Sequence, residues 1–131
     1  MDISLMEAYI IETLKENGIS LEETERRIAE DQLAEWQEQY KMDFTLLKRL
    51  EPQQLRDAFS GKYRIKFVTI NGLKNLLRMR FDIQANHYME VENGLLNLSI
   101  NKTIEEQIRG MLSSNWTITR AGDEISILVE G

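Results

Sequence analysis

The side chains best suited to binding chemistry gather in one stretch of the chain, positions 62–81. This stretch holds six Lys or Arg residues and no Asp or Glu, whereas positions 1–57 hold 14 acidic against 7 basic residues and positions 82–131 hold 8 against 3. Cationic side chains can contact the phosphates of nucleic acids, and each contact adds to a salt-dependent affinity. The candidate nucleic-acid-binding residues in this stretch are Arg64, Lys66, Lys74, Arg78 and Arg80.

The same cations also have a purely structural interpretation. Lys and Arg residues that alternate along a strand usually form its solvated face, and Arg residues near a helix C-terminus are favoured by the helix dipole. They can also pair with the acidic helices that precede them. Base stacking on an RRM-type sheet has little support, because the strand expected over 95–100 carries no aromatic residue.

Catalytic chemistry has little support in this sequence. His87 is the only histidine, and the expected register places it on a hairpin's apolar face, where a packed, locally bonded histidine is commoner than a general base. Three pairs of adjacent acids are candidates for carboxylate chemistry. Two of them lie in the first turns of expected helices, where the helix dipole favours negative charge, and the third lies at an expected β-turn. These pairs are Glu22-Glu23, Glu105-Glu106 and Asp123-Glu124. No phosphate-binding glycine loop, metalloprotease helix or nucleophile elbow is present, so we expect no catalytic centre, cofactor or metal.

A second binding candidate is the long helix expected over about 21–40. Its apolar stripe is narrow and its other faces are charged, so it must pack on another surface. Aromatic anchors on such a helix can dock into a partner's groove or onto a second copy of the protein. Packing against its own neighbouring helices is the alternative. The candidate partner-binding residues are Leu33, Trp36 and Tyr40.

Helical periodicity dominates positions 1–60, where we expect about four helices. The two longer ones, over about 5–16 and 21–40, each follow a Ser that stands three residues before a Glu, which is the spacing of a capping box. Asp and Pro suit the starts of the two shorter ones. The residues expected at the four helix starts are Ser4, Ser20, Asp43 and Pro52.

After Ser60-Gly61 the pattern changes to that of an α/β domain, 61–131. Alternating apolar and cationic residues predict a strand over 63–67. Asn71-Gly72 is a strong hairpin signal, but a hairpin there would mix polar and apolar residues on both faces. A helix over 69–81, capped by its first residue, segregates them better. We adopt the helix and keep the hairpin as the alternative.

Two hairpins and a helix complete the expected domain. Asn93-Gly94 turns a hairpin over 87–100, in which Val91 pairs with Leu96 on the apolar face. An amphipathic helix follows Thr103, and a last hairpin turns at Gly122-Asp123. The order β-α-β-β-α-β-β is that of a ferredoxin-like or similar antiparallel sheet with one extra strand, in an α+β fold. That topology hosts many activities and by itself implies none.

Composition narrows the class of protein. The chain of 131 residues has a net charge of −6 and no cysteine, which suits a reducing compartment. It shows no basic secretory signal and no apolar run of about 20 residues, so we expect a cytoplasmic protein without a membrane partner. The leading hypothesis is a non-catalytic regulatory or adaptor protein that binds another protein or itself, as a homodimer. The alternative is a nucleic-acid-binding regulator that uses segment 62–80.

Overall fold

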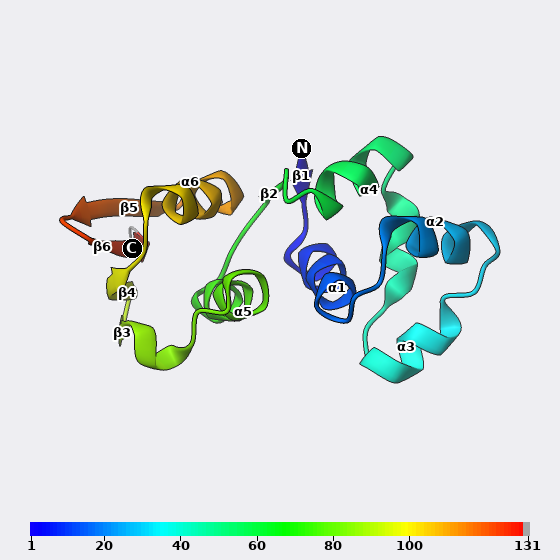
Figure 1. Ribbon diagram of the computed structural model, residues 1–131, viewed down its shortest axis with the longest axis horizontal. Helices are drawn as coiled ribbons and strands as arrows, with labels where there is room; N and C mark the ends of the chain where they lie inside the picture. Colours follow the sequence, from blue (N-terminus) through cyan, green and yellow to red (C-terminus); the bar gives the residue numbers. More distant parts are fainter. Residues whose placement is uncertain (130–131) are drawn as a thin grey trace.

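The computed structural model describes residues 1–129 and has an α+β fold (Figure 1). Helices α1 to α4 gather at one end, a four-stranded antiparallel sheet and α6 lie at the other, and α5 lies between them. Buried apolar side chains from both ends form one cluster, which extends along the chain from Ile3 to Ile127. The predicted class is confirmed, while the strand order and the number of helices differ from those expected. In the described part of the chain, no helix is long and apolar enough to cross a bilayer.

Helix α1 (Leu5–Glu16) is the centre of the N-terminal part and contacts both α4 and α5. Its predicted capping box is confirmed. The Ser4 hydroxyl accepts a hydrogen bond from the Glu7 N–H at 3.1 Å, and the Glu7 carboxylate accepts one from the Ser4 N–H at 2.9 Å. Most of its surface is covered, and its fully buried apolar residues are Ala8, Ile10, Ile11 and Leu14.

The prediction of one continuous helix over 21–40 is wrong. The structure has two helices there, α2 (Leu21–Ala29) and α3 (Ala34–Tyr40). Between them Asp31 has a φ of 55°, a left-handed conformation that Asp tolerates better than most residues, and the Gln32 N–H donates to the Arg27 carbonyl at 2.8 Å. The apolar residues keep a helical spacing through this turn, so the sequence pattern gave no sign that α2 ends there.

The two shorter helices begin where they were predicted. Asp43 precedes the 3-10 helix η1 (Phe44–Arg49), and its carboxylate accepts a hydrogen bond from the Thr45 N–H at 3.1 Å. Pro52 occupies the first turn of α4 (Pro52–Phe59). With the break between α2 and α3, positions 1–60 therefore hold five helical segments instead of about four.

The strand predicted over 63–67 is shorter and pairs elsewhere. Only β2 (Arg64–Ile65) is extended and paired, and its partner is the parallel strand β1 (Asp2–Ile3). The Lys66 N–H also donates to the Ile3 carbonyl, at 2.9 Å. Strand β2 pairs with β1 in a separate two-stranded sheet and is not part of the C-terminal sheet, so the ferredoxin-like order does not form. The partner of β2 lies some 60 positions earlier in the chain, so the residue pattern around β2 could not indicate which strand it pairs with.

The helix adopted over 69–81 is confirmed as α5 (Ile70–Phe81). The Thr69 hydroxyl accepts a hydrogen bond from the Gly72 N–H at 3.0 Å. Gly72 serves packing here, because a Cβ at this position would lie 2.7 Å from a methyl carbon of Leu5 on α1. The Asn-Gly pair therefore marks a close helix contact and forms no hairpin turn.

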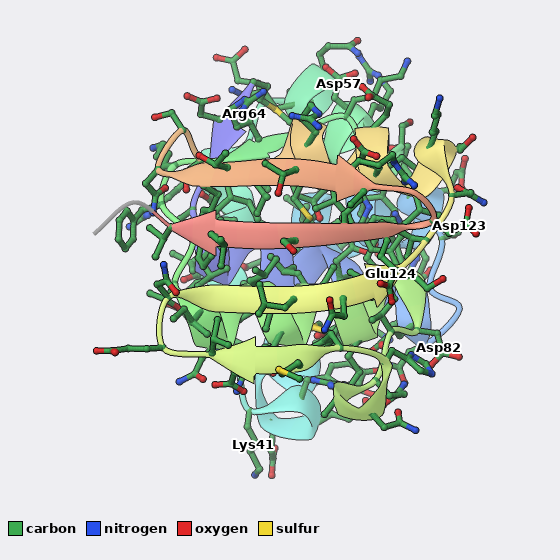
Figure 2. All side chains as sticks on the ribbon, turned by 90° about the vertical axis from the view of Figure 1, so that its left-hand side faces the viewer. Lys41, Asp57, Arg64, Asp82, Asp123 and Glu124 are labelled. Atoms are coloured by element: carbon green, nitrogen blue, oxygen red, sulfur yellow. The ribbon has the colours of Figure 1, made fainter. Side chains whose placement is uncertain are left out.

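The C-terminal sheet consists of two hairpins joined by α6 (Lys102–Met111). Its order is β3-β4-β6-β5, with β3 (Met89–Val91), β4 (Gly94–Ser99), β5 (Trp116–Ala121) and β6 (Glu124–Val129). The last hairpin turns at Gly122-Asp123 as predicted. Asn101 caps α6, so the start predicted at Thr103 is two residues late. Figure 2 views the sheet face that no helix covers.

The first hairpin has a register in which each β3 residue pairs two positions earlier along β4 than predicted. Val91 pairs with Gly94 instead of Leu96, and an irregularity between Leu95 and Leu98 lets both side chains reach the core. A Cβ at Gly94 would lie 2.1 Å from the carbonyl oxygen of Ile127 on β6. Strand β6, which approaches this glycine closely, lies outside the hairpin. A prediction that paired only the two strands of the hairpin, starting from the turn, therefore could not find the correct register.

We expect Gly94→Ala to destabilise the fold and Gly110→Ala to stabilise it. The first substitution drives a methyl group into the β6 backbone, and overpacking of this kind costs about 1–3 kcal/mol. The second adds a Cβ inside α6 with no atom within 4 Å, which favours the helix by up to about 1 kcal/mol. Chemical denaturation measures the free energy of unfolding of both variants. An equal change in the two variants would contradict the close approach of the Ile127 carbonyl to Gly94.

Candidate functional site

The aromatic residues predicted as partner anchors lie in or beside the helical core. Leu33 and Trp36 are each 3% exposed, and Tyr40 is half-buried. The Phe44 ring centroid lies 5.7 Å from that of Trp36 and 5.8 Å from that of Tyr40. These contacts correspond to packing against neighbouring helices. The anchor role stays a prediction, and the burial of Leu33 and Trp36 argues against it.

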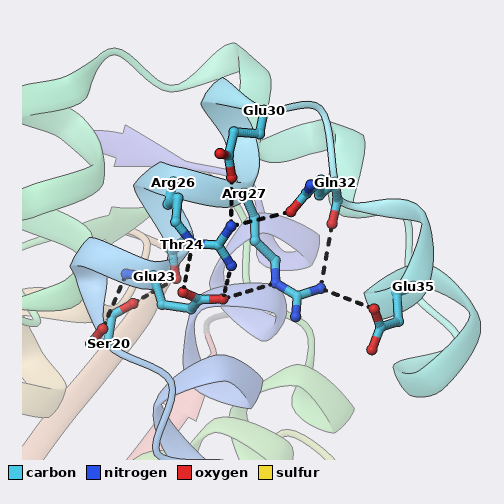
Figure 3. Close-up of polar contacts among 8 residues, drawn as sticks. All are labelled: Ser20, Glu23, Thr24, Arg26, Arg27, Glu30, Gln32 and Glu35. Carbon is cyan, nitrogen blue, oxygen red and sulfur yellow. Dashed lines mark hydrogen bonds and ion pairs between the residues drawn. The ribbon is translucent and has the colours of Figure 1, made fainter.

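A network of charged side chains spans the break between α2 and α3 (Figure 3). The Arg27 guanidinium lies 4.6 Å from the Trp36 ring centroid, donates to the Glu23 carboxylate at 3.1 Å and lies 3.6 Å from Glu35. Arg26 donates to the same Glu23 carboxylate at 2.6 Å. These two guanidinium groups lower the pKa of Glu23 to about 2. The network therefore connects α2 to α3 on either side of the turn.

The structure separates the cations of the basic stretch. Lys74 forms an ion pair with Glu90 at 2.8 Å, and this bond raises the pKa of its ammonium group. Arg78 lines a different depression, between α1 and α5. Lys66 is exposed. Arg64 and Arg80 line one cleft, whereas Lys74 and Arg78 line a separate depression together with Glu90.

That cleft, which we call the cationic cleft, lies between the chain that follows α4 and helix α6. Its volume is about 330 Å³, and the charged residues that line it are Lys62, Arg64, Arg80 and Glu106. Arg80 donates to the Gly61 carbonyl at 3.0 Å, and Arg64 donates to the Leu112 carbonyl at 2.6 Å. Sequence reasoning found Arg64 and Arg80 but did not select Lys62 from the same stretch.

A buried hydrogen bond lies behind this cleft. The Tyr63 hydroxyl donates to the Glu12 carboxylate at 2.7 Å, and the two residues are 4% and 2% exposed. Burial, together with the adjacent Glu12 charge, raises the pKa of the Tyr63 hydroxyl well above its usual value. The Lys15 ammonium lies 3.7 Å from the same carboxylate. Because 51 positions separate the bonded residues, no sequence signal indicated this pair.

The groups considered for catalysis are dispersed. His87 is exposed and lies in the 3-10 helix η2 (Ala85–His87), so the prediction that it lies on the apolar face of the hairpin is wrong. The predicted local hydrogen bond is present, because the His87 Nδ1 accepts from the Gln84 N–H at 2.9 Å. Glu105 is held by Arg109 and Arg120, which lower its pKa. Within residues 1–129, no group of three His, Cys, Asp or Glu side chains could hold a metal ion.

A second surface combines an exposed aromatic residue with the edge of the sheet. Phe67 is 62% exposed, the largest value among the exposed large apolar residues. The next residue, Val68, is fixed beside the start of β5. Its N–H donates to the Ser113 hydroxyl at 3.1 Å, and its carbonyl accepts from the Trp116 indole at 2.8 Å. Phe67 therefore lies close to the start of β5, and we call Phe67 together with the exposed edge of β5 the β5 edge surface.

Comparison with models of known protein families, with curated proteins and with solved structures finds no match. The function is therefore argued from the surfaces of the molecule, since a fold class alone does not imply an activity.

We expect Tyr63→Phe to lower the free energy of unfolding by about 1–3 kcal/mol. The substitution keeps the ring but removes the hydrogen bond to a buried carboxylate, which then lacks its closest donor. Tyr40→Phe is the matched control, because no hydrogen bond of the Tyr40 hydroxyl is found within residues 1–129. Urea denaturation of both variants provides the measurement, and equal losses would contradict a special contribution of the Tyr63 bond.

We expect the ion network at Glu23 to make stability depend on pH under acidic conditions. The pKa of Glu23 falls from an ordinary 4.5 to about 2 in the folded protein. Its stabilisation is therefore complete above pH 4.5 and lost as the pH falls towards 2. The wild type should lose stability in this window more steeply than Glu23→Gln, measured by thermal unfolding at a series of pH values. Glu38→Gln, at an exposed position, should follow the wild type.

Proposed function

We propose that this protein is a non-catalytic binding protein that takes up an extended segment of another protein along β5. The observation that carries the proposal is the unpaired outer edge of this strand. In the sheet order β3-β4-β6-β5, strand β5 is terminal, and among residues 1–129 it pairs with β6 alone. An unpaired edge presents backbone N–H and C=O groups to which an extended segment can add as a further strand.

The hairpin register identifies the backbone groups that point outward. Ala121 and Glu124 close a two-residue turn, and such a closing pair is hydrogen-bonded. Bonded and non-bonded pairs then alternate along the antiparallel ladder. Accordingly, the residues with backbone groups directed towards β6 are Thr117, Thr119 and Ala121, and those with groups directed outward are Ile118 and Arg120. The Trp116 N–H fits this alternation, because it donates to Ser113 outside the ladder at 3.2 Å.

Strand β5 lacks three of the features that commonly protect an edge: short length, proline and outward-pointing lysine. It has six residues and contains neither Pro nor Lys. Its one charged residue, Arg120, is bound to Glu105 and to the carbonyls of Ile100 and Gly122, both at 2.9 Å. The opposite edge strand, β3, has only three residues. The longer edge is therefore the one left available for pairing.

The surroundings of β5 indicate the chemistry of the partner segment. Phe67 offers apolar contact at one end of the edge. A hollow of about 120 Å³ beside Trp116 and Ile118 has Arg64 and Arg109 as its charged lining residues. A segment with alternating apolar residues and an acidic residue near this hollow is complementary. Two copies paired through β5 would bring two such cationic hollows to one short ladder, which disfavours a homodimer through this edge.

The alternative function, nucleic-acid binding through segment 62–80, has weaker support. Lys74 is paired with Glu90, and Arg78 lies away from the cleft that holds Arg64 and Arg80. Phosphate contacts along a nucleic acid require several cations on one continuous surface. The net charge of −6 also opposes the approach of a polyanion.

A peptide library displayed on phage tests the proposed function. We expect the wild type to enrich peptides with alternating apolar residues and at least one acidic residue. The dissociation constant of synthetic versions should rise about tenfold or more in Phe67→Ala, because an aromatic contact at an interface contributes on the order of 2 kcal/mol. Met89→Ala is the matched control, since Met89 is 55% exposed on the opposite edge strand and should leave affinity unchanged.

Amide hydrogen exchange distinguishes strand addition from other binding modes. On peptide binding, the amides of Ile118 and Arg120 should gain protection, whereas those of Thr117 and Thr119 should already be protected in the free protein. No enrichment of peptides, or protection confined to other strands, would overturn the proposal. Salt-dependent binding of labelled duplex DNA, single-stranded DNA or RNA that is lost when Arg64, Lys66, Lys74 and Arg78 are changed to Ala would favour the alternative.

A further inference from the structure

The cationic cleft is a separate feature, and we infer that it binds the phosphate group of a small phosphomonoester with free hydroxyl groups, such as a sugar phosphate. This inference goes beyond the proposed function and does not depend on it. The side chains that carry it are Lys62, Arg64, Arg80, Glu106 and Gln107, all of which line the cleft.

Lys62, Arg64 and Arg80 line this cleft without an ion pair in the described part of the chain, and the one acidic side chain that lines it, Glu106, lies 3.9 Å from Arg109. The ion pairs of residues 1–129 use other Lys and Arg residues. Arg64 and Arg80 donate to neutral backbone carbonyls, and Lys62 is exposed. The sequence has 22 acidic residues, yet none of those in residues 1–129 forms an ion pair with these three cations. A bound anion would supply the counter-charge that these three cations lack.

Arg80 is the most constrained of the three cations. Its guanidinium lies 5.1 Å from the Tyr63 ring centroid and 5.2 Å from that of Phe81. One terminal nitrogen, Nη2, donates to the Gly61 carbonyl, and the other, Nη1, is buried without a hydrogen-bond partner. A Cβ at Gly61 would lie 2.6 Å from Nη2, so the glycine leaves the space that the guanidinium occupies. A guanidinium held in this way presents a positive charge at a fixed place beside the cleft, which favours an anion there.

The other lining groups favour a ligand with hydroxyl groups. Glu106 and Gln107 line the cleft from α6. A carboxylate accepts hydrogen bonds from hydroxyl groups, and an amide both donates and accepts them. The volume of about 330 Å³ is at the lower end for small-molecule sites and fits a sugar-sized ligand. Tyr63 is 4% exposed and already contacts Arg80, so it supplies no platform for stacking a nucleobase.

Titration of the ¹⁵N-labelled protein with ribose 5-phosphate, at constant ionic strength, tests the inference by NMR. We expect saturable shifts of the backbone amides at Gly61, Lys62, Gln107 and Gly110. Ribose without phosphate should cause none, and inorganic phosphate should bind more weakly because it lacks the hydroxyl contacts. Affinity should rise as the pH increases through about 6, where the phosphate gains its second negative charge.

Two variants and a matched control complete the test. Lys62→Ala, at an exposed position where we expect no effect on folding, should weaken binding about tenfold, and Arg80→Gln should abolish it. Lys66→Ala removes an exposed cation from the same stretch but outside the cleft, and should leave affinity unchanged. The absence of saturable shifts, or equal weakening by Lys62→Ala and Lys66→Ala, would overturn the inference. None of these variants alters Phe67 or β5, so failure here is distinguishable from failure of the proposed function.

Discussion

The parallel pairing of β1 with β2, backed by the buried Tyr63–Glu12 hydrogen bond, is the constraint on which the rest of the structure depends. It holds the middle of the chain against the first helix, and α5 then lies along α1. The C-terminal sheet forms from four later strands, and β2 is not among them. The same pairing carries Lys62 and Arg64 to the cleft that Arg80 lines from α5.

The sheet that results has unequal edges, and this inequality underlies the proposed function. Two hairpins meet through β4 and β6, which leaves the three-residue β3 at one edge and the six-residue β5 at the other. The linker from β2 to α5 passes the start of β5, where Val68 is bonded to Ser113 and Trp116. The exposed Phe67 therefore lies close to the start of β5, although 48 positions separate the bonded residues Val68 and Trp116.

The basic stretch illustrates why charge along a sequence differs from charge on a surface. Its six cations are close in the chain, yet an acid neutralises Lys74, aromatic rings flank Arg80, and Arg78 lies on another side of α5. A helix and a strand that share one stretch present their side chains in several directions. The cations that stay uncompensated at one cleft, and not the whole stretch, are the ones available to a small anion.

Elements whose signals are local could be predicted from the amino-acid sequence. The caps at Ser4 and Thr69, the turn at Gly122-Asp123 and the apolar stripe of α6 each depend on residues within a few positions, and they led to correct helices and a correct hairpin. Tertiary structure decided the break after α2, the partner of β2, the register at Gly94 and the grouping of Lys62, Arg64 and Arg80. Each of these depends on contacts between residues far apart in the chain, such as Glu12 with Tyr63 or Gly94 with Ile127, and local periodicity carries no information about such contacts.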